Sequence, residues 1–515
     1  MPRDIDVDAI MQRAIDRPDL VVHPGDLPAT MRALRDLIAE APGTLFDRGG
    51  RPVRVIAPPD QPLRLAPITS NSFVEIAHDY ARPVQIDKDD NHKPVTLPER
   101  VAKMWLDSGD QRLPALDGVA TGPLLADDGT IRTASGYDPA TRLWCSPMPA
   151  VPVSPHPTRQ EAEHALHHLR DTFASFPFAD AERVIVDGLD LVDTDKPPGE
   201  AETAFLAGLM TAVARPSLWL APGLLVTAPD ISGAGAGKGL LVQAISEIAF
   251  GSPPVAFTAG NDRAELDKRI ASALLQTGTA LFLDNVNSTA LKSDTLASVL
   301  TERPAKVRLF GQTAMAELNS TAWVAVTGNG LTVSEDLARR FVFVELDPKC
   351  DDPEGRHFAE GRDEFLSTIH KNRAALLGSV LTIWRWGRQN ADQLQAGKPL
   401  GSFEKWTRWV RDPLLTLGCA DPVEAIAKAK AHDPRRLRVA EMFEAWFEAH
   451  HDLPVPAGQL DETVRCILDP QARGRQYLTT SLNAHVGTRA GGYVLTRQDA
   501  AGKWGRSTYA LKRAS

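Results

Sequence analysis

The chain has 515 residues, of which 43% are hydrophobic and 24% charged, and its formal net charge is −9. This length exceeds what one hydrophobic core organises, so we expect about two to four domains of ordinary globular composition. No stretch approaches the roughly 18 uninterrupted apolar residues of a membrane span, and the first residues lack a secretion-signal pattern. We therefore expect a cytoplasmic protein with no membrane partner.

The cysteines and the charge distribution exclude further classes of site. The four cysteines form no C-x-x-C pair, which argues against a disulfide framework and a thiolate zinc site. The net negative charge gives no global reason to bind nucleic acid. However, the segment from Arg473 to the end contains eight basic residues and one acidic residue, so contact with a polyanion is expected to be local.

Residues 1–150 mix helical and strand-like patterns and predict an α+β domain of unknown role. The periodicity over 27–41 predicts a helix, and FDRGGRPVRVI predicts a strand region with turns. The acidic QIDKDDNHK segment suggests a metal site, but its flanking strand-like residues favour a hairpin turn. The prolines of 146–158 predict a linker. We assign residues 151–215 to this linker and a helical collar that follows it.

Residues 216–350 carry short apolar runs separated by helix-length spacers. The runs are GLLVT, PVAFT, ALFLD, WVAVT and FVFVEL. Near-continuous apolar runs of this length are typical of parallel strands that are covered on both faces. The sequence therefore predicts an α/β core with a five-stranded parallel sheet.

The remainder of the chain is predicted to form two further parts. A helical segment over 351–435 contains Trp384, Trp386, Trp406 and Trp409, which we expect to be packing residues. In 436–515, helical patterns precede the strand candidates GYVLTR and STYALKR. Helices followed by a basic hairpin are typical of a winged-helix-like DNA-binding module; a winged helix that binds proteins or regulates is the alternative.

The strongest chemical motif is SGAGAGKG, which follows the first predicted core strand and begins a helix. Glycines let backbone N–H groups approach phosphate oxygens, the helix N-terminus adds partial positive charge, and a lysine reaches the terminal phosphates. The pattern predicts an ATP-binding loop made of Ser232, Gly233, Ala234, Gly235, Ala236, Gly237, Lys238 and Gly239. Compared with G-x-x-x-x-G-K-[ST], Ser232 replaces the first glycine and Gly239 replaces the hydroxyl residue that ligates magnesium. A flexible Gly/Ala turn is the alternative.

Two further strand ends carry polar residues. ALFLDNVN delivers Asp284 to the carboxyl edge of the sheet, where we expect it to hold Mg²⁺ through water; a loop-capping aspartate is the alternative. Asn285 follows, and its amide orients water but cannot accept a proton. WVAVTGNG places Asn329 at the next such strand end, where its amide can contact the γ-phosphate and the attacking water.

Arginines and a hairpin complete the set of candidate residues. SEDLARRF places Arg339 and Arg340 at a helix end before the last strand, where we expect one to act on a neighbouring subunit's phosphoryl group; a surface salt bridge is the alternative. AKVRLFGQTAMAELN predicts a hairpin that tracks single-stranded DNA by charge, an edge hairpin with solvated charges being the alternative. The candidate DNA-binding residues are Lys306, Arg308, Gln312, Arg475, Arg489, Arg497, Lys503 and Arg506.

The order of these motifs within residues 160–350 resembles the A, B, B-prime and C series of superfamily 3 helicases, a branch of AAA+ ATPases. The resemblance extends to primase-helicase-like ATPases of phages, plasmids and integrated elements, although the sequence shows no primase active-site pattern. It implies a hexameric ring that hydrolyses ATP with Mg²⁺ between subunits and moves along single-stranded DNA. Lys238, Asp284, Asn329 and Arg339 or Arg340 match the phosphate ligand, metal-site acid, sensor and arginine finger.

The same resemblance marks a departure. Related motors have a second acid where this chain has Asn285, so the identity of the catalytic base stays open. Three functions follow as hypotheses: an ATP-dependent DNA helicase or translocase of a mobile element, an initiator or loader that oligomerises on DNA without unwinding it, and a nucleotide-binding scaffold with weak hydrolysis.

Overall fold

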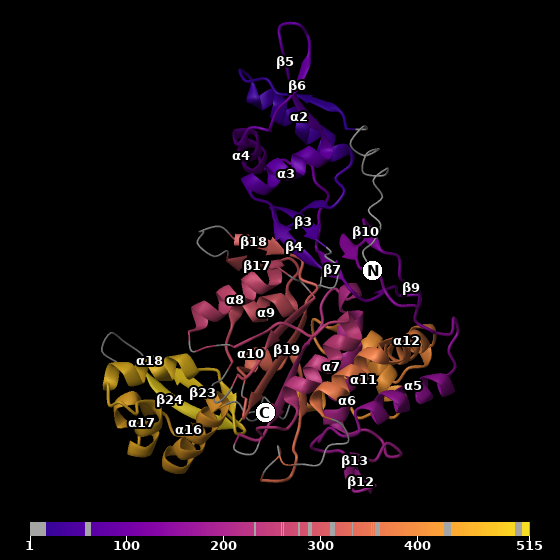
Figure 1. Ribbon diagram of the computed structural model, residues 1–515. Coiled ribbons are helices and arrows are strands. Elements are labelled where there is room, and N and C mark those ends of the chain that lie inside the picture. Colours follow the sequence, from indigo (N-terminus) through magenta and orange to yellow (C-terminus); the bar gives the residue numbers. More distant parts are fainter. Residues whose placement is uncertain are drawn as a thin grey trace. The chain divides into compact units, whose positions relative to one another are not determined.

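The computed structural model describes residues 17–56, 63–230, 233–258, 260, 262–276, 279–286, 291–308, 315–331, 333–351, 353, 355, 361–426, 434–499 and 507–513. The chain divides into two compact units, Met1–Leu331 with Arg340–Pro422, and Thr332–Arg339 with Val423–Ser515 (Figure 1). Among these residues no helix combines the length and apolarity that crossing a membrane requires.

The N-terminal part of the first unit has the predicted mixture of helices and short strands. Its elements are β1 (Asp19–Val21), α2 (Leu27–Glu40), β2 (Leu45–Asp47), β3 (Pro52–Ile56), β4 (Arg64–Pro67), α3 (Ser70–Tyr80), β5 (Arg82–Ile86), β6 (His92–Pro94), α4 (Glu99–Asp107), β7 (Gly118–Ala120), β8 (Leu124–Leu125), β9 (Ile131–Arg132), β10 (Gly136–Asp138) and β11 (Leu143–Cys145). The apolar faces of α2, α3 and α4 share one core, in which Phe73 stacks on Trp105 with ring centroids 4.1 Å apart. The QIDKDDNHK segment is a hairpin turn between β5 and β6, and the Asp87 carboxylate accepts from the N–H groups of Asp89 and Asn91.

A helical layer follows the proline-rich segment 146–157, which has no helix or strand. The segment is nevertheless held in place, because Arg385 and Gln389 donate to its backbone carbonyls. The layer consists of α5 (Arg159–Thr172), the hairpin β12 (Arg183–Val186) and β13 (Leu189–Val192), and α6 (Glu200–Ala214). The hairpin was not predicted, because the sequence was interpreted as helical up to Arg215.

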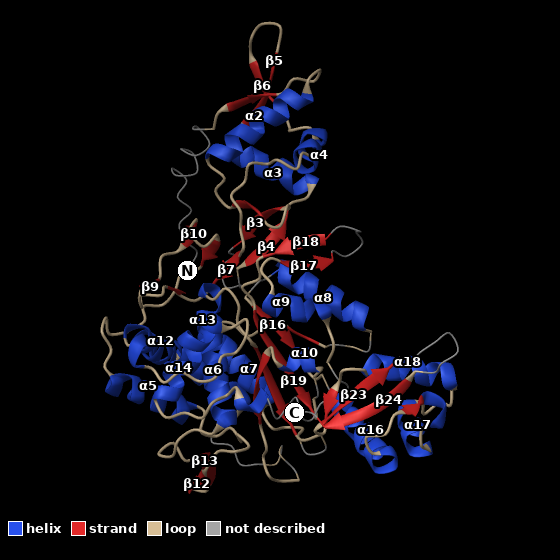
Figure 2. Cartoon of the chain, turned by 180° about the vertical axis from the view of Figure 1, so that it is seen from behind, coloured by secondary structure: helices blue, strands red, loops and turns tan. Residues whose placement is uncertain are grey.

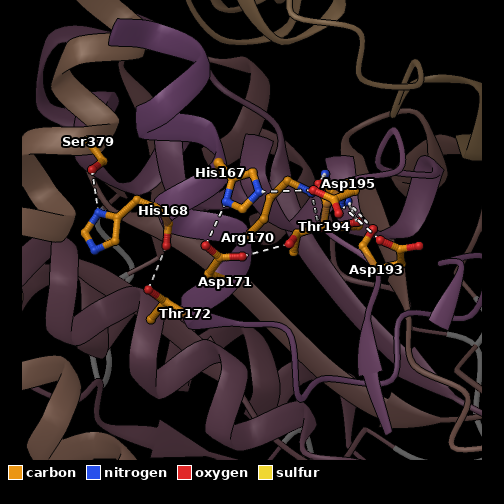
Figure 3. Close-up of polar contacts among 10 residues, drawn as sticks. His167, His168, Arg170, Asp171, Thr172, Asp193, Thr194, Asp195 and Ser379 are labelled. Carbon is orange, nitrogen blue, oxygen red and sulfur yellow. Dashed lines mark hydrogen bonds and ion pairs between the residues drawn. The ribbon is translucent and has the colours of Figure 1, made fainter. Parts of the chain in front are cut away.

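Polar contacts join the end of α5 to the segment before α6 (Figure 3). Asp171 binds both His167 and the hydroxyl of Thr194, at 2.7 and 2.8 Å. Arg170 donates to the carbonyls of Asp193 and Thr194 and forms a buried two-pronged ion pair with Glu202 of α6. These contacts fix α5 against α6, and every residue of α6 after Glu200 is buried.

The five predicted apolar runs form one parallel sheet. Its strands are β14 (Gly223–Ala228), β15 (Ala256–Phe257), β16 (Ala280–Leu283), β19 (Trp323–Asn329) and β20 (Phe341–Glu345), in the order β15-β16-β19-β14-β20. All neighbouring pairs are parallel. The α/β core with a five-stranded parallel sheet is therefore confirmed.

The strand order creates a switch point beside β14. The chain leaves β14 through α7 (Lys238–Phe250) toward the β15 edge, whereas it leaves β19 through α10 (Glu335–Ala338) and crosses to β20 on the other side of β14. In open α/β sheets, ligands bind at the carboxyl ends of the strands where the connections change direction. α6 packs on α7 and β20, and α8 (Arg263–Gln276) packs on β16 and α9 (Asp294–Thr301) (Figure 2). The switch point thus lies at the carboxyl ends of β14 and β19.

Helices after β20 complete the first unit. They are α11 (Arg362–Lys371), α12 (Arg373–Gln389), α13 (Glu404–Trp406), a π-helical turn over Thr407–Arg411, and α14 (Asp412–Thr416). Trp384, Trp386, Trp406 and Trp409 are all buried, which confirms them as packing residues.

The second unit has its own core. Its elements are α10, α16 (Pro434–His450), β21 (Val455–Pro456), α17 (Glu462–Leu468), α18 (Arg475–His485), β22 (Arg489–Ala490), β23 (Tyr493–Gln498) and β24 (Thr508–Arg513), and the strands form a sheet in the order β21-β24-β23-β22. Apolar residues of α16, α17, α18 and the sheet form one cluster around Trp446. The helical patterns predicted before the two strand candidates form α16, α17 and α18, and the strand candidates form β23 and β24.

Candidate nucleotide site at the carboxyl edge of the sheet

The loop between β14 and α7 depends on glycine at three positions. Gly235 and Gly237 have φ angles of 73° and 93°, values that residues other than glycine rarely adopt. A Cβ on Gly233 would lie 2.2 Å from the carbonyl oxygen of Pro229, so only glycine fits there. No described side chain caps the first turn of α7, which leaves its N–H groups available to an anion. Ser232 lies outside the described residues.

Lys238 is folded over this loop. Its Nζ donates to the carbonyl oxygen of Gly233 at 2.6 Å, and the side chain is buried. Burial lowers the pKa of the ammonium below its usual range, and the charge of Asp284 opposes that shift. The lysine charge therefore lies inside the loop and near the end of β16, where a terminal phosphate would be neutralised.

Asp284 follows β16 and is held by two donors. The Thr327 hydroxyl of β19 and the backbone N–H of Asn285 both donate to its Oδ1. A Cβ on Gly239 would lie 4.0 Å from each carboxylate oxygen of Asp284. Position 239 thus faces the carboxylate of Asp284, the candidate metal ligand. A serine or threonine side chain at this position would contact that carboxylate. Thr327 was missed by sequence reasoning, although it lies within the WVAVTGNG motif.

Asn285 adopts a left-handed backbone conformation with a φ of 56°. Asparagine tolerates this region better than most residues with a side chain, including glutamate. The next residue, Val286, donates its N–H to the carbonyl of Thr327, and its own carbonyl would lie 2.1 Å from a Cβ on Gly328. The glycine at 328 therefore permits the ends of β16 and β19 to approach closely.

Asn329 and the phosphate loop are in contact. A Cβ on Gly233 would lie 2.9 Å from the Oδ1 of Asn329, and the Asn329 backbone pairs with Ala228 at the end of β14. Gly330 has a φ of 53° and packs on Asp230 of the same loop. The glycines of T-G-N-G thus bring the ends of three strands together.

The two candidate arginines occupy different surroundings. Arg340 directly precedes β20, and its carbonyl accepts from the N–H of Gly223 at the start of β14. It therefore lies at the amino edge of the sheet, a strand length of roughly 16 Å from the phosphate loop of its own chain. Arg339 is exposed and pairs with Asp336 of the preceding turn at 2.5 Å. The structure does not bring Arg340 to the candidate site of the same chain.

The hairpin predicted between the Asp284 and Asn329 strands is present. β17 (Ala305–Arg308) pairs with β18 (Met315–Leu318) in an antiparallel register. Lys306 is exposed, and its Nζ lies 3.8 Å from Glu317. Gln312 lies outside the described residues.

The candidate DNA-binding arginines of the second unit differ in their contacts. Arg475 is the first residue of α18, and Arg489 lies on β22; both are exposed. Arg497 is engaged within the unit, because it binds Asn483 and Asp499 at 2.9 and 2.6 Å. Lys503 and Arg506 lie outside the described residues.

Comparison with known proteins gives only distant structural likeness. No protein-family model and no curated protein matches the chain. The apo structure of the NrS-1 C-terminal region is 12% identical with a TM-score of 0.30, and the match covers 65% of this chain and 83% of that one. The structure of SCCmec type IV Cch, described as an active helicase, is 11% identical with a TM-score of 0.33, and the match covers 92% of each chain. Similarity at this level does not extend to activity, so the functional argument rests on the site itself.

Proposed function

We propose that the protein is an ATPase that binds ATP and Mg²⁺ at the carboxyl ends of β14 and β19 and uses the hydrolysis to move along DNA. The observation that carries this proposal is the convergence of Gly233, Lys238, Asp284 and Asn329 at one edge of the sheet. A flexible glycine turn would not require an aspartate, a threonine and an asparagine from two other strands.

The residues present fit a nucleotide with its metal ion. The N–H groups of the loop and Lys238 would hold the β- and γ-phosphates, and Asp284 would hold Mg²⁺ through water. When bound, Mg²⁺ neutralises charge that develops on the transferring phosphoryl group. Asn329 orients the attacking water, and Asn285 has the same capacity. Neither amide accepts the proton, so the base comes from another group or hydrolysis is slow.

The position of Arg340 favours hydrolysis between subunits. An arginine at the amino edge of the sheet lies too far from the phosphate site of its own chain to contact it, so any phosphate it binds would belong to a neighbouring copy. We infer a homo-oligomeric ring, and the resemblance to superfamily 3 helicases makes six subunits the expected number. Arg339, which is paired within its own helix, is the second candidate for the finger.

Two regions are proposed to contact DNA. The β17–β18 hairpin presents the exposed Lys306 and would track a single strand by charge. In the second unit β21 lies between α16 and α17, and β22, β23 and β24 follow α18, which is the element order of a winged helix; Arg475 and Arg489 would contact duplex phosphates. Together these regions suit a helicase or translocase in the replication of a mobile element.

A nucleotide-binding scaffold with weak hydrolysis is the second candidate function. It is favoured by Gly239, which lacks the magnesium-ligating hydroxyl, and by Asn285, which lacks an acid. An initiator or loader that uses ATP as an assembly signal would share the site but not unwind DNA.

Hydrolysis by mixed subunits tests the proposal. Wild-type protein is expected to hydrolyse ATP faster with single-stranded DNA present. Lys238→Ala and Arg340→Ala should each be inactive alone. When the two variants are mixed, some interfaces combine an intact loop with an intact arginine, so activity should return to a fraction of the wild-type rate.

Controls separate the alternatives. Lys371→Ala removes an exposed lysine outside the site and should leave hydrolysis unchanged. Failure of the mixture to recover, while each variant still binds ATP and assembles, would refute hydrolysis between subunits. ATP-dependent assembly without separation of a forked duplex would favour the loader, and slow hydrolysis that DNA does not stimulate would favour the scaffold.

A further inference from the structure

The amino edge of the sheet, opposite the nucleotide site, carries an exposed tryptophan. Trp219 precedes β14 and is 56% exposed; the other tryptophans that the structure describes are buried or half-buried. An indole left in water forgoes the burial that normally stabilises so large an apolar side chain. Its exposure is therefore a feature to be explained.

One residue holds this tryptophan in place. The guanidinium carbon of Arg303 lies over the indole ring, 4.8 Å from its centroid. The same guanidinium donates to the backbone carbonyls of Leu218 and Trp219 at 3.2 and 3.3 Å. Arg303 thus fixes the backbone and covers part of the ring by a cation–π contact, while 56% of the tryptophan surface stays exposed to a planar partner.

Two further arginines lie close to Arg303. Arg142, which binds the Asp117 carboxylate at 2.9 Å, is one of them, and the buried Arg215 is the other. Arg215 is fully buried and donates to three backbone carbonyls rather than to an acid, and burial lowers its pKa to about 9. The exposed Lys306 of the β17–β18 hairpin follows Arg303 by three residues.

We propose that Trp219 is a stacking platform for an unpaired nucleobase of single-stranded DNA. Arg303 backs the ring, and the positive charge of Arg303 and Lys306 attracts the adjacent phosphates. Stacking on an aromatic ring beside basic groups is how proteins bind single strands without reading their sequence. A base within a duplex has both faces occupied and cannot stack here. The inference rests on the proposed DNA translocase and specifies where the strand is gripped.

The test measures binding of a fluorescein-labelled oligothymidylate of about 20 nucleotides by anisotropy. Trp219→Ala should weaken binding roughly 5- to 150-fold, the effect expected when one or more stacked bases lose their aromatic partner. Trp219→Phe should retain part of the affinity. Ile185→Ala, which truncates an apolar residue that is 67% exposed on β12, serves as the matched control and should change nothing.

An oligonucleotide of the same length with abasic sites isolates stacking from charge. Wild type should bind it more weakly than oligothymidylate, whereas Trp219→Ala should bind both with similar affinity. An equal loss on both oligonucleotides would overturn the inference. Unchanged binding by Trp219→Ala would also overturn it. The same holds if native mass spectrometry shows that Trp219→Ala no longer assembles while its DNA affinity is unchanged. If DNA stimulates ATP hydrolysis by the wild type but Trp219→Ala binds the oligonucleotide with normal affinity, only this inference fails. If the wild type neither hydrolyses ATP nor binds DNA, the proposed function fails as well.

Discussion

Replacing Gly239 by serine should supply the hydroxyl that the proposed Mg²⁺ site lacks. A Cβ at this position would lie 4.0 Å from both carboxylate oxygens of Asp284. A C–O bond of about 1.4 Å directed at the carboxylate would bring the hydroxyl within hydrogen-bond distance of it. The substituted side chain therefore lies where a hydroxyl and Asp284 can share one magnesium ion.

The magnitude follows from one added polar contact in a preformed site. A neutral contact of this kind contributes about 0.5–1.5 kcal/mol, so the concentration of Mg²⁺ for half-maximal hydrolysis should fall roughly 2- to 12-fold. The backbone at 239 is already helical, and apart from its chain neighbours and the helix's own backbone no described atom lies closer than 4.0 Å to the new Cβ, so no strain is expected. Stability should rise by at most about 0.5 kcal/mol from the higher helix propensity of serine.

The assay is ATP hydrolysis as a function of free Mg²⁺ for wild type, Gly239→Ser and Gly239→Ala. Alanine adds the Cβ and the helix propensity without the hydroxyl, so it should raise stability and leave the Mg²⁺ dependence unchanged. If serine and alanine have the same Mg²⁺ dependence, or if serine blocks ATP binding, the reasoning about position 239 is refuted.

Three further outcomes are expected elsewhere in the first unit. Thr327→Val keeps the side-chain shape but removes the hydroxyl that donates to Asp284, so thermal unfolding should show a loss of about 1–3 kcal/mol and ATP affinity should fall; unchanged stability and affinity would contradict this contact. Glu202→Leu leaves the buried Arg170 charge unpaired and should cost about 3–5 kcal/mol, most of which Arg170→Met should recover in the double variant. The Cys419 thiol, whose pKa burial raises to about 12, should react with an aromatic disulfide reagent only as the protein unfolds, even at pH 9; rapid labelling of the native protein would contradict its burial.

Local patterns in the sequence were sufficient to predict most elements. The apolar runs predicted all five strands of the sheet, because a strand buried on both faces must be apolar throughout. The same reasoning found the helices of the second unit. It missed the β12–β13 hairpin, although the Asp187-Gly188 turn between two apolar runs is a strong hairpin signal. Because the flanking segments have helical periodicity, the whole region was predicted to be helical.

The sequence singled out the candidate residues but not their contacts. The glycine-rich loop and the ends of its neighbouring strands were proposed as a nucleotide site, because strand, glycines and lysine follow one another along the chain. The contacts of Thr327 with Asp284 and of Asn329 with Gly233 join residues far apart in sequence. No local pattern encodes them, since they depend on which strands become neighbours.

The sequence by itself therefore determined which segments are strands and which loop can approach a phosphate, because these follow from side-chain periodicity and the conformational freedom of glycine. Only the tertiary structure decided the strand order, which gathers Lys238, Asp284 and Asn329 at one edge and places Arg340 at the other. Tertiary packing also places position 239 opposite Asp284 and brings Arg303 over the ring of the exposed Trp219. These are contacts across the fold, and they arise only when distant segments share one core.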